Sequence, residues 1–260
     1  MSLIDDDQAE DLWGYAKRLR FVREAIKAAF PERPPHSLSL LDVGCGNGSQ
    51  LALPLATRDG FQLTGIDTDS GSIEHARRLA GQSANINFVC GSVDDLCHKR
   101  LFDIVILSEV LEHLEQPSDL LSLSARLMSR DGILIVTVPN GYGEFEIDSW
   151  IYRKLRLQKL VDALAEKREV LGATDNEESG HVQFFTRSRL RRLFASVGLV
   201  SFREGAGSFL AGPIVGHALT RSMRLIDWNA RVTDRLPFIL ASGWYFALRR
   251  AEQETAGGDA

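Results

Sequence analysis

Three glycines at alternate positions follow a short apolar run near residue 40. The run Leu40–Val43 reads Leu-Leu-Asp-Val, and the glycines are Gly44, Gly46 and Gly48. Glycine lets the backbone turn tightly and approach a ligand closely. A second apolar run ends in Asp67, whose carboxylate can accept both hydrogen bonds of a ribose diol. The two features predict a crevice that binds a nucleoside.

The spacing of these glycines distinguishes between classes of nucleotide-binding loop. A dinucleotide-binding loop reads G-x-G-x-x-G, and a phosphate-binding P-loop carries Lys after its last glycine. This chain has G-x-G-x-G, and Ser49 follows the last glycine. Neither of those loops matches, and a glycine-rich turn that binds no ligand is the alternative to a nucleoside site.

The block Leu41–Gly48 resembles the glycine loop of class I S-adenosylmethionine (SAM) methyltransferases, whose usual form is close to Leu-Asp-Val-Gly-Cys-Gly-x-Gly. The resemblance implies SAM as the cofactor and S-adenosylhomocysteine as its product. It also implies cofactor contacts in this loop and at the strand end beyond it, from Asp42, Gly44, Cys45, Gly46, Gly48, Asp67 and Thr68. The alternative for this strand end is a carboxylate that caps the following helix, a role that suits Asp69.

The tripeptide Gly91-Ser92-Val93 stands at the next position where the resemblance implies a cofactor contact. Similar methyltransferases have Gly-Asp-Ala there, with the acid near the adenine amino group. The hydroxyl of Ser92 can accept one hydrogen bond but supplies no charge, and Asp94 is the nearest carboxylate that could replace the acid. We expect Val93 to pack against the adenine ring.

The segment Phe102–Pro117 resembles the fourth-strand motif of small-molecule methyltransferases, especially the ubiquinone-biosynthesis O-methyltransferases. The resemblance implies that Ser108 and Glu109 border the sulfonium group. His113 lies on the turn beyond, where a neutral imidazole could take the proton of an acceptor hydroxyl. The alternatives are that His113 only packs or caps the turn, or that it binds a divalent metal with Glu109 and Glu112. Because three ligands from one short turn are crowded, we predict no metal.

His181 is the second candidate for a catalytic base. The sequence from Gly180 to Thr186 resembles the Gly-His-x-x-x-Phe-Thr stretch that similar methyltransferases carry before their last crossover helix. The resemblance implies that His181 faces the acceptor pocket. The hydroxyl of Thr186 suits an N-cap of the helix that follows.

Strands and helices alternate along the part of the chain that carries these motifs. Short apolar runs predict strands at 39–44, 61–66, 86–90, 103–108 and 132–138, and helical patterns lie at 49–57, 70–80 and 117–128. The alternation predicts a doubly wound α/β fold, and the resemblance implies the seven-stranded, Rossmann-like sheet of class I methyltransferases. Ligands of such a sheet bind at the carboxyl ends of its strands, where every motif above lies.

The remaining segments predict additions to this sheet. An amphipathic helix at 8–30 belongs to an N-terminal helical cap at 1–37, and the methyltransferase domain then covers 38–250. The pattern beyond residue 139 predicts helices near 149–171, 187–197 and 212–236, and strands at 199–203 and 244–249. We expect lid insertions at 141–180 and 207–240, and a disordered tail at 251–260. The helix at 149–171 is basic and amphipathic; we interpret it as a lid, with peripheral membrane contact as the alternative.

The composition suits a soluble domain in a reducing compartment. The 260 residues are 44% hydrophobic and 25% charged, and the net charge of −5 argues against a protein that wraps nucleic acid. The cysteines Cys45, Cys90 and Cys97 form no C-x-x-C pair. With neither a signal peptide nor a membrane-spanning run, we expect a cytoplasmic protein. We interpret Cys45 as a small packed residue of the glycine loop, not as a nucleophile.

These features predict a SAM-dependent methyltransferase that acts on a hydroxyl of a small or lipid-linked molecule. The alternatives are a SAM-binding module of the same fold without catalysis, and methyl transfer to nitrogen or carbon of a small molecule or protein. A nicotinamide-dependent oxidoreductase would need G-x-G-x-x-G or a Tyr-x-x-x-Lys pair, and a nucleic-acid amino methyltransferase would need Asn/Asp-Pro-Pro-Tyr after the fourth strand. Because the chain has none of these sequences, we expect a small-molecule acceptor and no nucleic acid.

Overall fold

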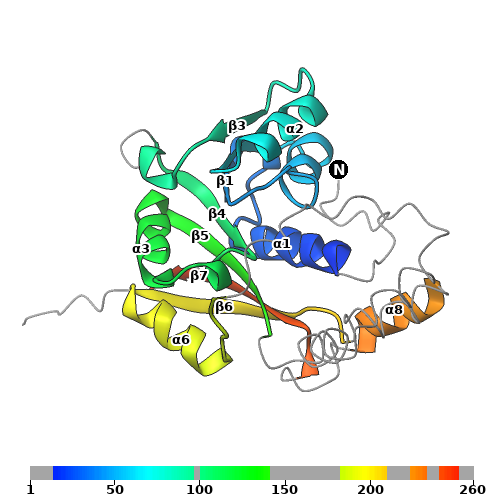
Figure 1. Ribbon diagram of the computed structural model, residues 1–260, viewed down its shortest axis with the longest axis vertical. Helices are drawn as coiled ribbons and strands as arrows, with labels where there is room; N and C mark the ends of the chain where they lie inside the picture. The colour runs from blue at the N-terminus through cyan, green and yellow to red at the C-terminus, as the bar shows by residue number, and fades with distance from the viewer. Residues whose placement is uncertain (1–13, 97–99, 141–181, 210–222, 233–239, 252–260) are drawn as a thin grey trace, which may run out of the picture.

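The computed structural model describes residues 14–96, 100–140, 182–209, 223–232 and 240–251 (Figure 1). Several expectations lie outside these residues: the start of the first helix, the helix near 149–171 with its membrane alternative, Cys97, His181 and the tail beyond residue 251. Among the described helices, none combines the length and the apolar character that crossing a membrane requires.

Seven strands form one sheet in the order β3-β2-β1-β4-β5-β7-β6. Their bounds are β1 Ser39–Val43, β2 Gln62–Asp67, β3 Ile86–Cys90, β4 Phe102–Ser108, β5 Met128–Pro139, β6 Leu199–Ala206 and β7 Gly243–Arg250. Strands β1 to β5 pair in parallel, whereas β7 is antiparallel to both β5 and β6. The strand order reverses between β1 and β4, which is where a doubly wound sheet opens a crevice for a ligand. The predicted seven-stranded α/β sheet is confirmed.

Helices cover both faces of the sheet. The described α-helices are α1 Tyr15–Ala29, α2 Ser70–Ala80, α3 Pro117–Leu127, α6 Arg187–Ser196 and α8 Met223–Val232. Side chains of α1 and α2 join the apolar cluster on one face, and those of α3 and α6 join the cluster on the other. Figure 1 shows α1 and α2 on the side of the sheet away from α3 and α6. The helices predicted at 70–80, 117–128 and 187–197 agree with α2, α3 and α6 to within one residue at each end.

The segment after the glycine loop differs from the regular helix expected at 49–57. The chain forms a wide π-helical turn at Pro54–Arg58 (η2). Pro54 has no backbone N–H with which to bond the preceding turn, so the regular pattern of amide donors is interrupted there. The amide of Asp59 then reaches back five residues and donates to the carbonyl oxygen of Pro54 at 3.4 Å.

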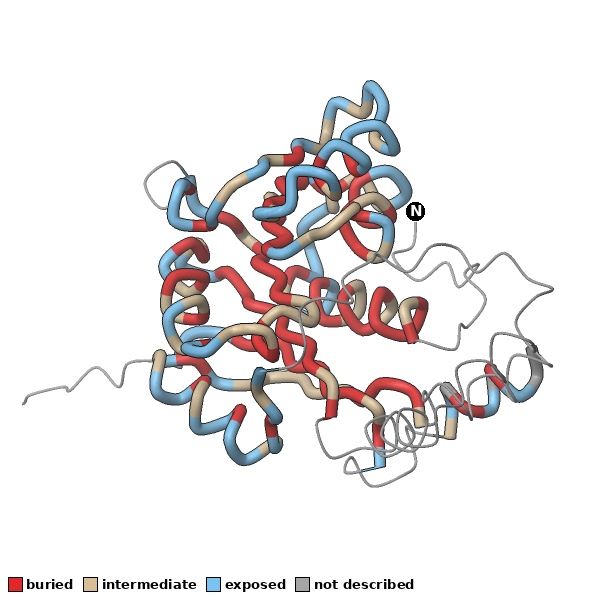
Figure 2. The backbone as a smooth tube through the Cα atoms, in the orientation of Figure 1, coloured by how far each residue is buried: buried red, intermediate tan, exposed pale blue. Residues whose placement is uncertain are grey.

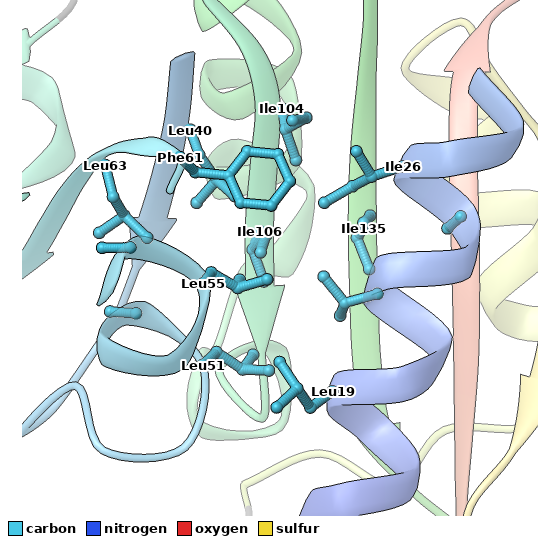
Figure 3. Packing of buried hydrophobic residues seen from close by; sticks show 14 of the residues in the cluster. Leu19, Ile26, Leu40, Leu51, Leu55, Phe61, Leu63, Ile104, Ile106 and Ile135 are labelled. Atoms are coloured by element: carbon cyan, nitrogen blue, oxygen red, sulfur yellow. The ribbon is translucent and has the colours of Figure 1, made fainter. Parts of the chain in front are cut away.

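The core lies against the central strands, whose side chains alternate between the two faces. On the face covered by α1, Leu40, Ile104 and Ile106 pack with Phe61 and with Ile26 of α1 (Figure 3). The residues between them in the strands point to the other cluster. Figure 2 shows the buried residues concentrated along these strands and along α1.

Candidate active site

On the face covered by α1, the side chains of four adjacent strands change from apolar to polar at their carboxyl ends. In β1, Leu40 is followed by Asp42 two residues later; the corresponding changes give Asp67 in β2, Ser108 in β4 and Thr137 in β5. The register places Asp42 beside Gly65 and Ile106, and Ser108 beside Thr137. Because side chains alternate with period two, these polar groups share one edge of one face.

The glycine loop follows β1 in backbone conformations that favour glycine. The φ angles of Gly44, Gly46 and Gly48 are 70°, 53° and 72°. A Cβ on Gly44 would lie 2.6 Å from Cγ2 of Val110, whereas a Cβ on Gly46 would meet no atom within 4 Å. The loop is thus packed against the turn after β4 at Gly44, whereas the space beside Gly46 is open.

The carboxylate of Asp67 ties this loop to the end of β2. Its Oδ2 accepts a hydrogen bond from the amide of Gly46 at 2.8 Å, and its Oδ1 accepts one from the amide of Asp69 at 2.9 Å. The helix cap is Asp69, which accepts from the amides of Gly71 and Ser72. The alternative of a capping carboxylate is therefore correct for Asp69 and not for Asp67. Thr68 is exposed at the rim between them.

Asp42 and Cys45 share a buried, acidic environment. Asp42 is 3% exposed. Burial, followed by the charge of Asp67, raises the pKa of Asp42 to about 7, and Arg18 opposes the shift. Burial and the neighbouring carboxylates of Asp42 and Asp67 raise the pKa of the Cys45 thiol far above its usual range. Cys45 remains a protonated thiol packed near Gly65, which agrees with its interpretation as a packing residue and not a nucleophile.

Helix α1 brings a buried guanidinium to this edge. Ile26, Val22 and Arg18 recur every four residues and therefore lie on one face of α1. The apolar residues of this face cover the apolar part of the sheet, and Arg18 lies where the side chains of the sheet become polar. Arg18 is 7% exposed. It donates to Oε1 of Gln50 at 3.2 Å and to Oγ of Ser108 at 3.3 Å.

An ion pair with Glu109 keeps this guanidinium charged. The Nη2 atom of Arg18 lies 3.3 Å from Oε1 of Glu109. Burial alone would lower the pKa of Arg18, but the charge of Glu109 and the nearby Tyr245 and Tyr15 raise it above its ordinary value. Arg18 was not predicted from the sequence, although a basic residue on the otherwise apolar face of the first helix could have indicated it.

Glu109 has a strained backbone at the end of β4. Its φ angle is 55°, the only positive value that a non-glycine residue shows within the described part of the chain. Such a conformation costs roughly 1–2 kcal/mol. Thr137 holds it: the Glu109 amide donates to the Thr137 carbonyl at 3.0 Å, and Thr137 Oγ1 donates to Glu109 Oε1 at 2.7 Å. Strand β5 thus aims this carboxylate at Arg18.

His113 lies on the turn Leu111–His113 (η4), directly after this strained residue. Its Nε2 is 3.9 Å from Oε1 of Glu112, and its side chain is one-third exposed. Glu112 is buried, and burial followed by the charge of Glu109 raises its pKa well above the usual range. The carbonyl oxygen of Glu112 accepts from the amides of Val182 and Gln183 at 2.9 and 3.0 Å. The chain that follows His181 is therefore fixed to the turn that carries His113, while His181 itself lies outside the described residues.

The adenine end of the expected site shows a different arrangement from the Gly-Asp-Ala pattern. Ser92 Oγ donates to Oδ2 of Asp94 at 3.1 Å, and the Ser92 amide donates to Asp95 at 3.1 Å. Asp94 therefore stands next to Ser92, where a carboxylate is expected. Val93 is 7% exposed and packs into the apolar cluster below, so its contact with adenine stays a prediction.

The structure gathers Asp42, the glycine loop, Asp67, Ser108 and Glu109 at one edge of the sheet, with His113 on the adjoining turn. Thr68 and Ser92 occupy the exposed rim. No group of three or more His, Cys, Asp and Glu side chains is placed to hold a metal ion among the residues that the structure describes. The arrangement is a cluster of carboxylates at the strand ends, with the guanidinium of Arg18 paired to the carboxylate of Glu109.

Comparisons with known proteins point the same way. The model of the methyltransferase domain family matches residues 13–201. The ubiquinone biosynthesis O-methyltransferase of Rhodopseudomonas palustris (strain BisB5) is 33% identical over 184 residues, which cover 64% of this chain and 72% of that protein. That of Rickettsia canadensis (strain McKiel) is 33% identical over 124 residues, which cover 47% and 51%. The chain spans about half the length of several of the curated relatives that it matches.

Solved structures agree on the fold. The structure of PKMT2 from Rickettsia typhi in complex with AdoHcy superposes with a TM-score of 0.55 at 17% identity, covering 88% of this chain and 52% of that one. A likeness at this identity concerns the fold and not the substrate. Since the family model covers most of the chain and the sheet, loop and acidic strand ends match its architecture, the chain belongs to the methyltransferase domain family, a class I family that uses S-adenosylmethionine as methyl donor.

Proposed function

We propose that this protein transfers the methyl group of SAM to a hydroxyl of a small or lipid-linked molecule. The observation that carries the proposal is the charge of the crevice: the carboxylates of Asp42, Asp67 and Glu109 converge there, and Arg18 balances them only in part. SAM carries a sulfonium and an ammonium group, which fit such a site, and one carboxylate, for which Arg18 is the partner. The nicotinamide and P-loop nucleotides would bring several phosphates, which this site would repel.

The residues of the protein form no covalent bond with the methyl group in this reaction. The bound cofactor supplies a methyl group on a sulfur that already leaves readily, so alignment of the acceptor and exclusion of water make up most of the catalysis. The Gly44–Gly48 loop and Asp67 position the nucleoside, and Ser108 and Glu109 border the transferred group. One of two histidines, His113 or His181, then takes the proton of the acceptor hydroxyl as the C–O bond forms.

A hydroxyl acceptor is supported by His113 and by the names of the relatives. A base is useful for a phenol or an alcohol, which must lose a proton as it is methylated. The relatives from Rhodopseudomonas palustris and Rickettsia canadensis are O-methyltransferases by name. The competing proposal of a SAM-binding module without catalysis predicts cofactor binding with no turnover on any acceptor.

The test combines calorimetry with a transfer assay. We expect SAM and S-adenosylhomocysteine each to bind, and radiolabelled methyl to move from SAM to catechols or hydroquinones in a panel that also contains amines. No binding of either compound would contradict the cofactor assignment. Transfer to amines alone would contradict the hydroxyl acceptor, and binding without any transfer would favour the module without catalysis.

Variants of the histidines then identify the base. We expect His113→Ala and His181→Ala each to retain SAM binding, and the variant that also retains turnover does not carry the base. His75→Ala is the matched control, because His75 is exposed on α2 away from the turn. Turnover that persists after treatment with a chelator would exclude the metal alternative at Glu109, Glu112 and His113.

A further inference from the structure

Three hydroxyl side chains form a row across the strand ends on the face that α1 covers. Ser108 of β4 lies beside Thr137 of β5, and Thr137 lies beside Tyr245 of β7. Thr137 is the middle member and is fully buried. The guanidinium of Arg18 contacts both outer members, because it donates to Oγ of Ser108 at 3.3 Å and is hydrogen-bonded to the side chain of Tyr245. The row of hydroxyls therefore underlies the buried cation of the site.

The directions of the hydrogen bonds around Thr137 follow from its single hydroxyl hydrogen. Thr137 Oγ1 donates this hydrogen to Oε1 of Glu109 at 2.7 Å. It can then only accept in its 3.0 Å contact with Oγ of Ser108, so Ser108 is the donor there. Ser108 in turn accepts from Nη1 of Arg18, and Nη2 of Arg18 lies 3.3 Å from the same oxygen of Glu109. The four side chains thus form a closed ring of hydrogen bonds and one ion pair.

This ring holds its members more firmly than separate pairs would. Hydrogen bonds in a chain polarise one another, and those to a charged group are stronger than those between neutral groups. Glu109 also has the positive φ angle of 55°, and its amide donates to the carbonyl oxygen of Thr137 at 3.0 Å. Thr137 therefore holds both the backbone and the carboxylate of Glu109, and through this carboxylate it orients the guanidinium of Arg18.

One donor of this guanidinium has no acceptor. Nε of Arg18 is buried and makes no hydrogen bond within the described part of the chain. The other two nitrogens are held by Gln50, Ser108 and Glu109. A buried N–H group without an acceptor is costly, and Arg18 is only 7% exposed. The free N–H group is therefore suited to an anionic group of a ligand.

We propose that Thr137 is a positioning residue of the cofactor site. Its hydroxyl orients the carboxylate of Glu109 and, through it, the guanidinium of Arg18, so that Nε–H of Arg18 meets the carboxylate of bound SAM. Because Thr137 is fully buried, it acts through these two side chains and not by contact with the ligand. The inference rests on the proposed function, because it concerns how the same site holds SAM. It assigns Thr137 to the amino acid end of the cofactor and not to the nucleoside.

Calorimetry of the full chain with three ligands tests this role. SAM and S-adenosylhomocysteine carry the amino acid carboxylate, whereas 5′-methylthioadenosine has the same nucleoside and a thioether but no amino acid. Thr137→Val keeps the shape of the side chain and removes the hydroxyl. We expect it to raise the dissociation constants for SAM and S-adenosylhomocysteine about five- to tenfold, and that for 5′-methylthioadenosine less than about twofold. Equal weakening for all three ligands, or no weakening for SAM, would overturn the proposal.

A second pair of variants isolates the hydroxyl. Thr137→Ser and Thr137→Ala lack the same methyl group and differ only in the hydroxyl. Thr137→Ser should bind SAM within about twofold of the wild type, and Thr137→Ala should bind it about five- to tenfold more weakly than Thr137→Ser. This pair keeps the test decisive if Thr137→Val does not fold. Thr64→Val makes the same exchange at a buried position of β2, and this matched control should bind each ligand as the wild type does.

A double-mutant cycle with Glu109→Ala shows whether Thr137 acts through Glu109. In the protein without the Glu109 carboxylate, Thr137→Val should change the dissociation constant for SAM by less than about twofold, because the group that Thr137 positions is gone. An effect as large as the one in the wild-type background would mean that Thr137 acts by another route and would contradict the proposal.

The outcomes also distinguish this inference from the proposed function. If neither SAM nor S-adenosylhomocysteine binds the wild type, the assignment of the cofactor fails. If both bind the wild type and bind Thr137→Val equally well, the methyltransferase proposal stands and only the role of Thr137 fails.

Discussion

At the scale of single residues, Arg18 connects segments that are distant in the sequence. Its guanidinium meets Gln50 after the glycine loop and Ser108 and Glu109 at the end of β4. Arg23, one turn and a half further along α1, makes a comparable pair with Asp59. Both arginines are largely buried and paired with a carboxylate, but only Arg18 contacts the strand ends of the candidate site.

We predict that Arg18→Met weakens both the fold and cofactor binding. Removing the cation leaves Glu109 partly buried beside Glu112 without its partner, which should lower the free energy of unfolding by about 2–4 kcal/mol. It should also raise the dissociation constant for SAM at least tenfold by removing the partner of the cofactor carboxylate. Urea unfolding and calorimetry measure the two effects.

Arg23→Met is the control for this prediction. It breaks the pair with Asp59, whose atoms lie 2.8 Å apart, and should lower stability without changing the dissociation constant for SAM. Wild-type affinity in Arg18→Met would show that Arg18 has a purely structural role.

The glycines of the loop provide a second matched pair. Alanine at Gly44 or at Gly46 meets a positive φ, which costs about 1–2 kcal/mol at either position. Only at Gly44 does the new methyl group also lie 2.6 Å from Val110. We predict that Gly44→Ala is less stable than Gly46→Ala by about 1–3 kcal/mol in chemical denaturation. Equal losses would mean that the turn after β4 moves freely away from the loop.

At the scale of elements, the ends of helices follow rules that are visible in the sequence. Thr186 caps α6, and its hydroxyl accepts from the amide of Arg189 at 3.2 Å. Asp69 does the same for α2. Local rules fail at Pro54, where a missing amide donor converts the expected helix into a π-helical turn. They also do not reveal that β5 begins at Met128, because the polar residues Ser129, Arg130 and Asp131 follow it.

We predict that Thr186→Ala destabilises the protein by about 1 kcal/mol, because an amide at the start of α6 loses its acceptor. Thr186→Ser keeps the hydroxyl and should be within about 0.5 kcal/mol of the wild type. Thermal unfolding followed by circular dichroism measures both. An alanine variant as stable as the serine variant would show that water replaces the cap without loss.

At the scale of the whole molecule, the site places polar and charged side chains at one edge of an apolar sheet, and this affects the free energy of unfolding. The central strands are buried on both faces, and their apolar side chains give way to Asp42, Ser108 and Thr137 only at the carboxyl ends. A buried carboxyl with a raised pKa binds its proton more tightly in the folded protein than in the unfolded chain. Folding stability therefore depends on the protonation of the site.

The sign of this dependence follows from proton linkage. The pKa of Asp42 is about 7 in the folded protein, against an ordinary value of 3.8. Between these values the folded state holds more protons, so its contribution to the free energy of unfolding falls as pH rises and is constant above about pH 7. We predict that the stability of Asp42→Asn relative to the wild type rises by about 2–3 kcal/mol between pH 5 and pH 8.

Urea unfolding of the ligand-free proteins at pH 5, 6.5 and 8 checks this prediction. Asp131→Asn, which alters an exposed carboxyl near the start of β5, serves as the control. A constant difference between Asp42→Asn and the wild type across this range would show that Asp42 is already ionised at pH 5.

The sequence alone determined the type of fold, the glycine loop and the acidic strand end, because these depend on local patterns. Apolar runs specify strands, glycines specify a tight turn, and Asp67 stands directly at the end of the second apolar run. The same local logic identified Asp69 as a cap candidate and Cys45 as a packing residue, and the structure agrees with both.

Only the tertiary structure decided what surrounds the cofactor loop. Arg18 precedes Glu109 by some ninety residues, and no local sequence pattern indicates that α1 crosses the sheet where β4 ends. The strained φ of Glu109 and the near-neutral pKa of Asp42 likewise arise from partners that folding brings together. Burial and Coulomb interactions depend on distance in space and not along the chain. The electrostatic character of this site therefore arises only when the sheet and α1 pack together.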